Sequence, residues 1–279
     1  MAHPPPLPAS APLLLRALFK RARNSQASAG ASFLADPVDP RLLERYRELL
    51  GFPAGAVPLT FHYLLAQRAQ LATMLGSGFP FRIAGMIHVA NDLRAAGPYD
   101  PARPVLLRTT ATIAPPKDNG AIHVLLDTTG QQDGREVFIC GSDYLAVRGK
   151  RGARPAAAAP SQSVPLAGWM LDSASGRRYA AVSGDWNPIH LARWSARLMG
   201  MRAPIIHGMH TVAKCCAALE ASTGHSVAAI SARFTAPVAL PGAVALSADV
   251  GAGTYTASSG GRDAVSGSFT LAQARHAAA

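Results

Sequence analysis

The sequence predicts an α+β fold made of two similar halves, and three observations support this prediction. Of the 279 residues 49% are apolar and only 15% are charged, which is enough apolar material for a packed core. A segment rich in Gly, Pro, Ala and Ser, residues 148–166, interrupts the chain near its middle. On each side of it a helical pattern precedes several strand-like runs, an order typical of helices packed against an antiparallel sheet.

The N-terminal segment differs from the rest in charge. Residues 1–35 contain no Asp or Glu but contain Arg16, Lys20, Arg21 and Arg23. This composition favours a solvated, partly helical basic arm, while a transit peptide or a contact with a membrane surface stays open. The predicted order is arm, first half, linker and second half: residues 1–35, 36–147, 148–166 and 167–279.

In the first half, the residues from Phe61 to Leu75 predict a helix. Leu64, Leu71 and Leu75 fall on one helical face, and Gly76 supplies the stop signal. Alternating or apolar runs then predict three strands, the last two joined by a hairpin-like connection at residues 130–134: residues 105–113, 121–128 and 135–147.

The second half repeats this order. A short helix is predicted at residues 188–199 and a longer one at residues 209–221, followed by strands at residues 227–238, 244–250 and 264–271. The longer helix carries a stripe at i, i+3, i+4, i+7 and i+8 that predicts a core-facing side: Met209, Val212, Ala213, Cys216 and Ala217.

Composition also restricts the class of protein. No apolar run reaches the roughly 18 residues of a membrane-spanning helix. Cys140 and the adjacent pair Cys215 and Cys216 give no disulfide framework, which favours a reducing, cytoplasmic compartment or, in a eukaryote, the mitochondrion. The net charge of +11 and pI near 10.3 predict attraction to an anionic partner. Nucleic acid is disfavoured, because only 6% of residues are aromatic and no recognition motif is present.

The segment from Tyr179 to His210 carries the chemistry. Asn187-Pro188 is a helix-start signal that places Asp185 just before the cap and His190 in the first turn. The positive end of the helix dipole favours the carboxylate of Asp185 and the neutral form of His190. The two groups are therefore expected to converge on one water molecule as a general acid–base pair.

The same segment does not match two other chemistries, a serine hydrolase and a zinc site. Ser183 lacks the G-x-S-x-G pattern of a hydrolase nucleophile, and the histidines have no zinc-type spacing, so no metal is expected. Gly208 begins the longer helix, where free N–H groups are suited to stabilise a developing oxyanion. Gly208 as part of a tight turn, with His207 and His210 as structural residues, remains an alternative.

The same residues resemble a known family. The string Tyr179-Ala-Ala-Val-Ser-Gly-Asp-Trp-Asn-Pro-Ile-His190, with His207-Gly208-Met209, is similar to the hydratase-2 motif of the MaoC-like dehydratases. Residues 232–242, ARFTAPVALPG, resemble a recurrent strand of that family. The resemblance extends over residues 167 to about 250 and implies a hotdog fold in the second half.

The first half resembles the degenerate N-terminal hotdog of two-domain members, notably in Phe79-Pro-Phe81 and Gly85-Met-Ile-His88. It contains no second D-x-N-P-x-H motif. The resemblance therefore implies a double hotdog, an antiparallel sheet wrapped around central helices, with one catalytic site per chain. The first half would complete the sheet and widen the acyl cavity, and His88 and Asn91 would be structural or cavity-lining.

The activity implied by the resemblance is reversible hydration of trans-2-enoyl thioesters to (3R)-3-hydroxyacyl thioesters. Asp185 and His190 would hold the water, the Gly208 amide would polarise the thioester carbonyl, and Asn187 and Ser183 would support the Asp185 loop. No cofactor is expected beyond the coenzyme A or phosphopantetheine of the substrate. A hotdog acyl-thioesterase and a noncatalytic acyl-binding subunit are the alternatives.

Local charge fits a substrate that carries phosphate. Between Ser175 and Leu219 six cations face one acid, a balance of +5 that falls to +3 when Asp172 and Glu220 are included. A basic rim would attract acyl-CoA or an acidic acyl carrier protein, and a solvated helical face is the alternative. A homodimer and a monomer both remain open. The residues expected to bind the substrate are Arg193, Arg197, Arg202 and His207.

Overall fold

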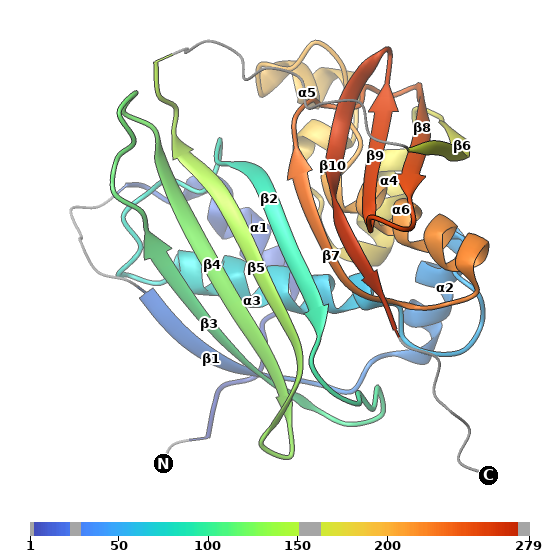
Figure 1. The fold of residues 1–279 in the computed structure, drawn as a ribbon. Coiled ribbons are helices and arrows are strands. Elements are labelled where there is room, and N and C mark those ends of the chain that lie inside the picture. Colours follow the sequence, from blue (N-terminus) through green and yellow to red (C-terminus); the bar gives the residue numbers. More distant parts are fainter. Residues whose placement is uncertain (1–2, 23–28, 151–162, 273–279) are drawn as a thin grey trace.

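Ten antiparallel strands form one continuous sheet in a computed structural model that describes residues 3–22, 29–150 and 163–272 (Figure 1). The end of the predicted arm, including Arg23, and most of the predicted linker lie outside these ranges. The strand order across the sheet is β1-β3-β4-β5-β2-β7-β10-β9-β8-β6. The strands are Ala29–Ala35 (β1), Ile87–Ala95 (β2), Val105–Ile113 (β3), Ile122–Gln132 (β4), Arg135–Val147 (β5), Val164–Leu171 (β6), Val227–Phe234 (β7), Gly242–Asp249 (β8), Thr254–Ser259 (β9) and Arg262–Leu271 (β10).

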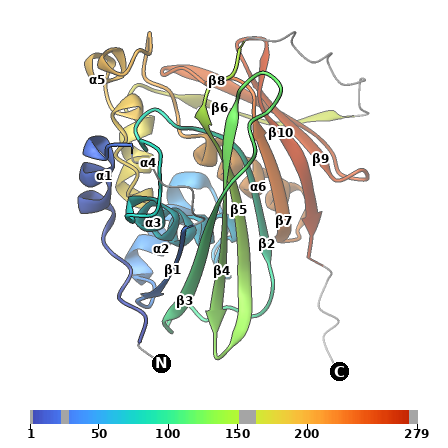
Figure 2. The same ribbon diagram turned by 90° about the vertical axis from the view of Figure 1, so that its left-hand side faces the viewer.

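The helices lie on one side of this curved sheet, as Figure 2 shows. Two long helices are central: α3 packs against β1, β3 and β4, and α6 packs against β6, β7 and β10. Shorter helices cover these two from outside. The helical segments are Ser10–Phe19 (α1), Pro40–Leu50 (α2), Leu59–Phe61 (η1), His62–Leu75 (α3), Ser175–Ser183 (α4), Pro188–His190 (η2), Arg193–Leu198 (α5) and Gly208–Thr223 (α6).

The two halves share one topology. The first half has the strand order β1-β3-β4-β5-β2 and the second half has the order β6-β8-β9-β10-β7. They join where β2 pairs with β7, with Leu93 opposite Ile230. Each half is thus a central helix against five antiparallel strands. The predicted double hotdog is confirmed.

The core forms where α6 meets the second half of the sheet. All five residues of the predicted apolar stripe are buried: Met209, Val212, Ala213, Cys216 and Ala217. Burial extends around the helix to Thr211, Cys215 and Leu219, because α2, η1 and the sheet enclose it. Each large apolar side chain that is fully buried stabilises the fold by about 1.5–3 kcal/mol. The three cysteines are free and buried, as expected of small apolar residues.

The predicted boundaries change at both the arm and the linker. Residues 29–35, which were placed in the arm, form β1 and pair with β3, Phe33 lying opposite Leu107. Residues 10–19 form α1, whose Leu13 and Ala17 are buried, so this part of the arm packs onto the protein rather than extending into solvent. The last residues of the predicted linker, from Val164, belong to β6. Alternation over so few residues is too weak a signal to separate an edge strand from a loop.

The predicted helix at residues 188–199 is divided in two. A single 3-10 turn, η2, is followed by α5, because the backbone of Ala192 between them is extended. The predicted strands at residues 105–113 and 135–147 match β3 and β5 in full. The strand predicted at residues 227–238 ends earlier, at Phe234.

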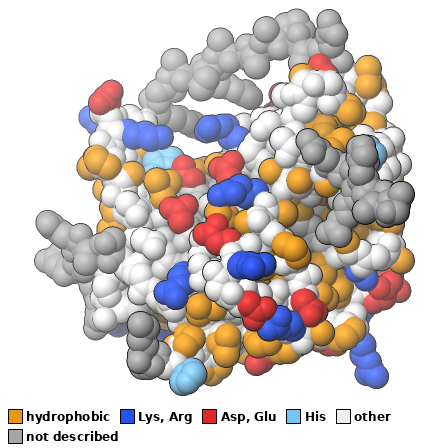
Figure 3. All heavy atoms as spheres, turned by 60° about the horizontal axis from the view of Figure 1, so that its bottom comes forward, with side chains coloured by type: hydrophobic (Ala, Val, Ile, Leu, Met, Phe, Trp, Pro, Cys, Tyr) orange, Lys and Arg blue, Asp and Glu red, His pale blue; other side chains and the backbone are white. Residues whose placement is uncertain are grey.

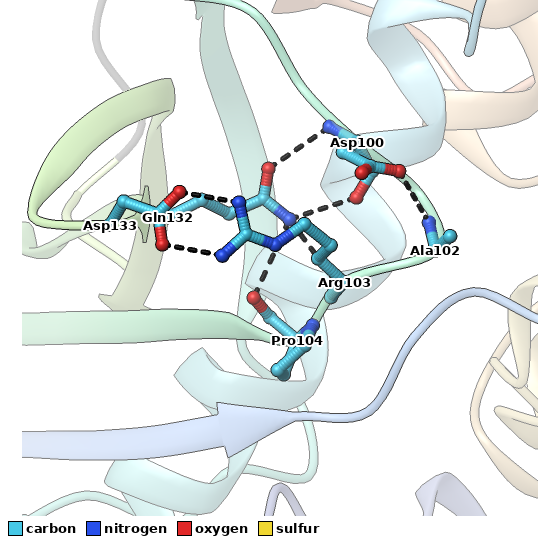
Figure 4. Close-up of polar contacts among 6 residues, drawn as sticks. All are labelled: Asp100, Ala102, Arg103, Pro104, Gln132 and Asp133. Carbon is cyan, nitrogen blue, oxygen red and sulfur yellow. Dashed lines mark hydrogen bonds and ion pairs between the residues drawn. The ribbon is translucent and has the colours of Figure 1, made fainter.

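The β4–β5 hairpin turns at Asp133 and Gly134, both with positive φ. Figure 4 shows how side chains tie this turn to the loop that leads into β3. The two terminal guanidinium nitrogens of Arg103, Nη1 and Nη2, donate to the carboxylate of Asp133, at 2.5 and 2.6 Å. Gln132 Nε2 donates to the Asp100 carbonyl at 2.8 Å, and Gln132 Oε1 accepts from the Asp100 amide at 3.0 Å. The long hairpin is thereby fixed at its tip.

Within the described residues, every helix is too short or too polar to cross a membrane. On the face shown in Figure 3, acidic and basic side chains are interspersed. The excess positive charge of the chain is therefore not gathered on that face.

Candidate active site

The loop of residues 184–187 connects α4 to η2 and carries Asp185. Gly184 ends α4 in the left-handed region, at φ 74°, which turns the chain sharply. The Asp185 amide then donates to Ser183 Oγ at 3.2 Å. Asn187 is the N-cap of η2, as predicted, and its Oδ1 accepts from the Ile189 amide at 3.4 Å. Ser183 and Asn187 thus fix the two ends of the loop.

His190 is buried and held in one orientation. Its Nδ1 donates to the carbonyl of Ile205 at 2.8 Å, because a carbonyl oxygen only accepts. This bond leaves the lone pair on Nε2 in the neutral ring. Gly176 of α4 packs directly on the His190 carbonyl, where a Cβ would collide with the oxygen. The backbone of His190 is therefore fixed as firmly as its ring.

His207 joins the loop to His190. Its Nε2 donates to the carbonyl of Asp185 at 2.9 Å. Its ring stacks on that of His190, with 3.6 Å between centroids and 27° between planes. The residue is 3% exposed and Nδ1 is buried without a partner among the described residues. These contacts suit a supporting role better than the substrate-binding role expected from the sequence.

The Asp185 carboxylate is held at both oxygens. Oδ1 accepts from the Asn187 amide at 3.2 Å, and Oδ2 accepts from Gln67 Nε2 at 2.9 Å. Gln67 lies on α3 of the first half, 118 residues before Asp185. Sequence reasoning missed this residue, and its one signal was a polar side chain within a helix whose other residues are largely buried.

The electrostatics of the site keep both groups in their basic forms at neutral pH. Burial opposes the charge of Asp185, but His207, His190 and the hydrogen bonds from Gln67 and Asn187 outweigh it and lower the pKa of Asp185. Burial lowers the pKa of His190, although Asp185 and the Ile205 carbonyl partly offset this effect. An anionic carboxylate and a neutral imidazole thus lie side by side.

This arrangement presents two hydrogen-bond acceptors to one small volume. Ligand atoms of Asp185, His190 and His207 lie within 4.8 Å of one another. Such a group can hold a cation, which spacing in the sequence did not reveal, because folding rather than sequence proximity brings the residues together. His207 Nε2 and His190 Nδ1 are already bonded to carbonyl groups, however. Asp185 and His190 Nε2 are two of the acceptors left free, beside the unpartnered His207 Nδ1, and they match the two O–H groups of one water molecule.

Gly208 begins α6 next to these groups, with His207 as the N-cap. The first N–H groups of a helix have no intrahelical acceptor, so the Gly208 amide is suited to a ligand oxygen. A Cβ at Gly208 would lie 2.6 Å from Cε1 of Phe234. Glycine is required here by the close approach of this ring, and not by a positive φ.

The first half closes the site from the other side. The ring of His88 on β2 stacks on Tyr144, 4.6 Å between centroids, and on Tyr63, 5.9 Å, and it also contacts Phe234. Burial lowers the pKa of His88 to about 4. Asn91 is 2% exposed and its amide donates to the Gly141 carbonyl at 2.9 Å, a structural contact. Both residues therefore lie in the interior, as expected.

The tentative substrate-binding arginines lie apart from this interior. Arg193 and Arg197 are exposed on α5, and Arg202 is exposed in the turn that follows. None of the three makes an ion pair in the part of the chain that the structure describes. Arg178 of the same basic segment is paired with Asp172 at 2.9 Å. The three arginines are free to meet a phosphate, and nothing in the structure places one there.

Comparisons with known proteins agree with the geometry. The family described as "MaoC like domain" matches residues 155–259. The 3-hydroxyacyl-thioester dehydratase X of Mycobacterium tuberculosis is 31% identical over 217 residues, which cover 75% of this chain and 76% of that protein. Peroxisomal multifunctional enzyme type 2 of Mus musculus is 29% identical over 165 residues, 54% of this chain but 22% of that protein.

Solved structures agree as well. The crystal structure of HtdX of Mycobacterium tuberculosis superposes with a TM-score of 0.71 at 27% identity, covering 86% of this chain and all of that one (100%). A MaoC-like dehydratase of Phytophthora capsici, at 17% identity and a TM-score of 0.68, shows the same fold. Sequence and structure together show that the chain belongs to the MaoC-like dehydratase family.

Proposed function

We propose that the protein catalyses the reversible hydration of trans-2-enoyl thioesters to (3R)-3-hydroxyacyl thioesters. One observation carries the proposal: the half-buried carboxylate of Asp185 and the buried His190 Nε2 are two acceptors, both in their basic forms, in a group whose ligand atoms lie within 4.8 Å of one another. Two such acceptors bind the two O–H groups of one water molecule and leave its oxygen lone pairs for an electrophilic carbon. The names of the relatives support the same reaction class.

In the hydration direction the water oxygen bonds to C3 while the Asp185 and His190 pair takes a proton from it. The electrons of the C2–C3 double bond move to C2 and the thioester oxygen, and C2 then receives a proton. The pair thereby returns to its starting protonation state, and dehydration is the reverse. The Gly208 amide would donate to the carbonyl oxygen as negative charge develops there, a contribution worth about 3 kcal/mol in comparable oxyanion sites.

The acyl group is carried by coenzyme A or by the phosphopantetheine of an acyl carrier protein. The exposed, unpaired guanidinium groups of Arg193, Arg197 and Arg202 support a phosphate-bearing or acidic carrier. A reducing compartment, the cytoplasm in a bacterium, fits the three free cysteines. The reaction needs no metal, so dialysis against EDTA should leave kcat unchanged. Loss of activity restored by a divalent cation would contradict this part.

The proposal is tested with crotonyl-CoA and a longer trans-2-enoyl-CoA. Loss of enoyl absorbance without release of free thiol is the expected result. Thiol release would instead support a thioesterase, and neither change would support an acyl-binding subunit. Coupling to dehydrogenases of opposite stereospecificity decides the hand of the product, for which (3R) is expected.

The two proposed catalytic groups are tested by Asp185→Asn and His190→Ala. Each should lower kcat by at least about a hundredfold, because a lost general acid–base group typically costs 10²–10⁴. Asp172→Asn and His225→Ala are matched controls on exposed residues and should keep full activity. A fully active Asp185→Asn variant would exclude the mechanism.

A further inference from the structure

We propose that Gln67, on α3 of the half that lacks the D-x-N-P-x-H motif, is a positioning residue that fixes the plane and the charge of the Asp185 carboxylate. The inference rests on the proposed function of Asp185. Through Gln67 the first half would then supply a residue of the catalytic site, in addition to completing the sheet and lining the acyl cavity.

The first argument is geometric. A carboxylate held only by the Asn187 amide at Oδ1 remains free to rotate about its side-chain bonds. The bond from Gln67 Nε2 to Oδ2, at 2.9 Å, adds a second fixed point. Two donors on two oxygens define the carboxylate plane and leave one acceptor site on each oxygen for water. The water is therefore presented in one orientation, which is what an addition to C3 requires.

The second argument concerns charge. An N–H donor stabilises the ionised carboxylate over the acid, and an amide itself does not titrate near neutral pH. Gln67 is one of the groups that lower the pKa of Asp185 against the effect of burial. Six other ionisable groups act electrostatically on Asp185, from η2, the N-cap of α6, β2, α3, β5 and α4: His190, His207, His88, Tyr63, Tyr144 and Tyr179.

Two of the six, His207 and His190, also lower the pKa of Asp185, and more strongly than Gln67 does, but both are themselves titratable, whereas the Gln67 amide is not. Burial lowers the pKa of His88 to about 4 and of His207 to about 3, and it lowers the pKa of His190. Burial raises the pKa of the three tyrosines. All six are consequently neutral at neutral pH, and Gln67 is a donor to Asp185 that stays the same over the whole working range.

The third argument is that α3 is anchored without Gln67. One residue later, Arg68 donates to the carbonyls of Leu7 and Pro8. One turn later, Gln70 Nε2 donates to the Leu126 carbonyl at 3.3 Å. Gln70 is more deeply buried than Gln67 and does not contact the site. A purely structural amide is thus present on the same helix and supplies a matched control.

The experiment compares Gln67→Met, which keeps the size and removes the donor, with Gln70→Met. Gln67→Met should lower kcat by about tenfold to a hundredfold with little change in KM. Its kcat/KM profile should also lose activity at a higher pH than the wild type on the acidic side, because the pKa of Asp185 rises. Gln70→Met should lower the Tm and leave both the profile and kcat near those of the wild type.

The variant Gln67→Glu should change the pH dependence of activity in the opposite direction. A glutamic acid at this position donates to Asp185 only while the two carboxyl groups share a proton, and the fully ionised pair repels. The activity of Gln67→Glu should therefore fall as pH rises through the range in which the wild type remains active. A structural role for Gln67 predicts no such inversion.

A wild-type profile and kcat in Gln67→Met would overturn the inference. A fall in Tm like that of Gln70→Met with an unchanged profile would overturn it as well. If the wild-type protein proves inactive on enoyl thioesters, the proposed function fails, and an NMR titration of the Asp185 carboxyl carbon still decides the inference. In that measurement the pKa of Asp185 should be higher in Gln67→Met than in the wild type, and equal values would refute the role of Gln67.

Discussion

His207 lies face to face with His190 at 3.6 Å between ring centroids, while the edge of the His207 ring is bonded to the backbone carbonyl of Asp185. One imidazole thereby contacts both members of the proposed catalytic pair. His207 thereby fixes the position of Asp185, in the loop, relative to His190, in the 3-10 turn that follows. The motif residues His207 and Gly208 are then proposed to have separate tasks, His207 supporting the pair through these contacts and Gly208 offering its amide to the substrate.

We predict that His207→Phe keeps the stacking contact with His190 and removes the hydrogen bond to the Asp185 carbonyl. Phenylalanine keeps an aromatic face for His190 but leaves the Asp185 carbonyl without its donor, a loss of about 1–3 kcal/mol in the free energy of unfolding. We expect kcat to fall about tenfold with KM nearly unchanged. Urea unfolding and steady-state kinetics measure both effects. A change mainly in KM would instead support the thioester-binding role that the sequence suggested for His207.

The stability of the protein should decrease in mild acid. Burial lowers the pKa of His62 to about 4 and of His207 and His210 to about 3, against an ordinary value of about 6.5. Between these values the unfolded chain binds more protons than the folded one, so the free energy of unfolding rises with pH and is fully developed above about 6.5. Below it, each of the three groups costs about 1.4 kcal/mol per pH unit.

Urea unfolding at pH 7.5, 6.0 and 5.0 measures this slope. His62→Phe should reduce the slope, because His62 stacks on Phe138 in the core, with 4.7 Å between centroids, and a phenyl ring can occupy the same place without a proton. Equal stability at all three pH values would contradict the assignment of neutral buried histidines.

Gly208→Ala should be destabilised by contact rather than by backbone strain. The new Cβ would lie 2.6 Å from Phe234 Cε1, so the ring must shift toward His88, at a cost of about 1–3 kcal/mol for overpacking. The double variant Gly208→Ala with Phe234→Leu removes the ring and should recover most of the lost Tm. No recovery in the double variant would show that another contact makes glycine necessary.

How much of the structure can be predicted from the sequence depends on how far apart in the chain the interacting residues lie. Local signals placed β3, β5 and α6 well, because alternation and helical periodicity arise within one element. The helix start at Asn187-Pro188 placed Asp185 and His190 correctly relative to each other, since a cap and its first turn are local. Elements with weak local patterns were not predicted: β9 and α4 were missed, and β1 was assigned to the arm. Contacts with distant parts of the chain decide the structure of these segments.

Non-local contacts were beyond the reach of the sequence. Gln67 is 118 residues from Asp185, and no pattern in α3 distinguishes it from Gln70, which bonds a core carbonyl. The grouping of His207 with Asp185 and His190 arises from the packing of α6 against the 184–187 loop. The arginines on and after α5 were predicted to bind substrate from their charge alone, and charge in a sequence carries no information about which other residues lie near them in the fold.

The N-terminal helix should contribute to both stability and activity. Leu13 of α1 is 2% exposed and α1 packs on α3, so Leu13→Ala should cost about 2–5 kcal/mol. Leu15, on the same helix but 60% exposed, gives the control Leu15→Ala, which should stay within about 0.5 kcal/mol of the wild type. The start of α1 also touches the loop of the site, since a Cβ at Gly184 would lie 2.8 Å from the Cβ of Ser10.

Deleting residues 1–20 should therefore lower kcat as well as the Tm, because the 184–187 loop loses the neighbour that α1 provides. Arg68 would also lose its two backbone acceptors, at Leu7 and Pro8, next to Gln67 on the same helix. Kinetics below the lowered Tm separate the two effects. A deletion variant with a wild-type kcat would show that α1 stabilises the fold without supporting the position of Asp185.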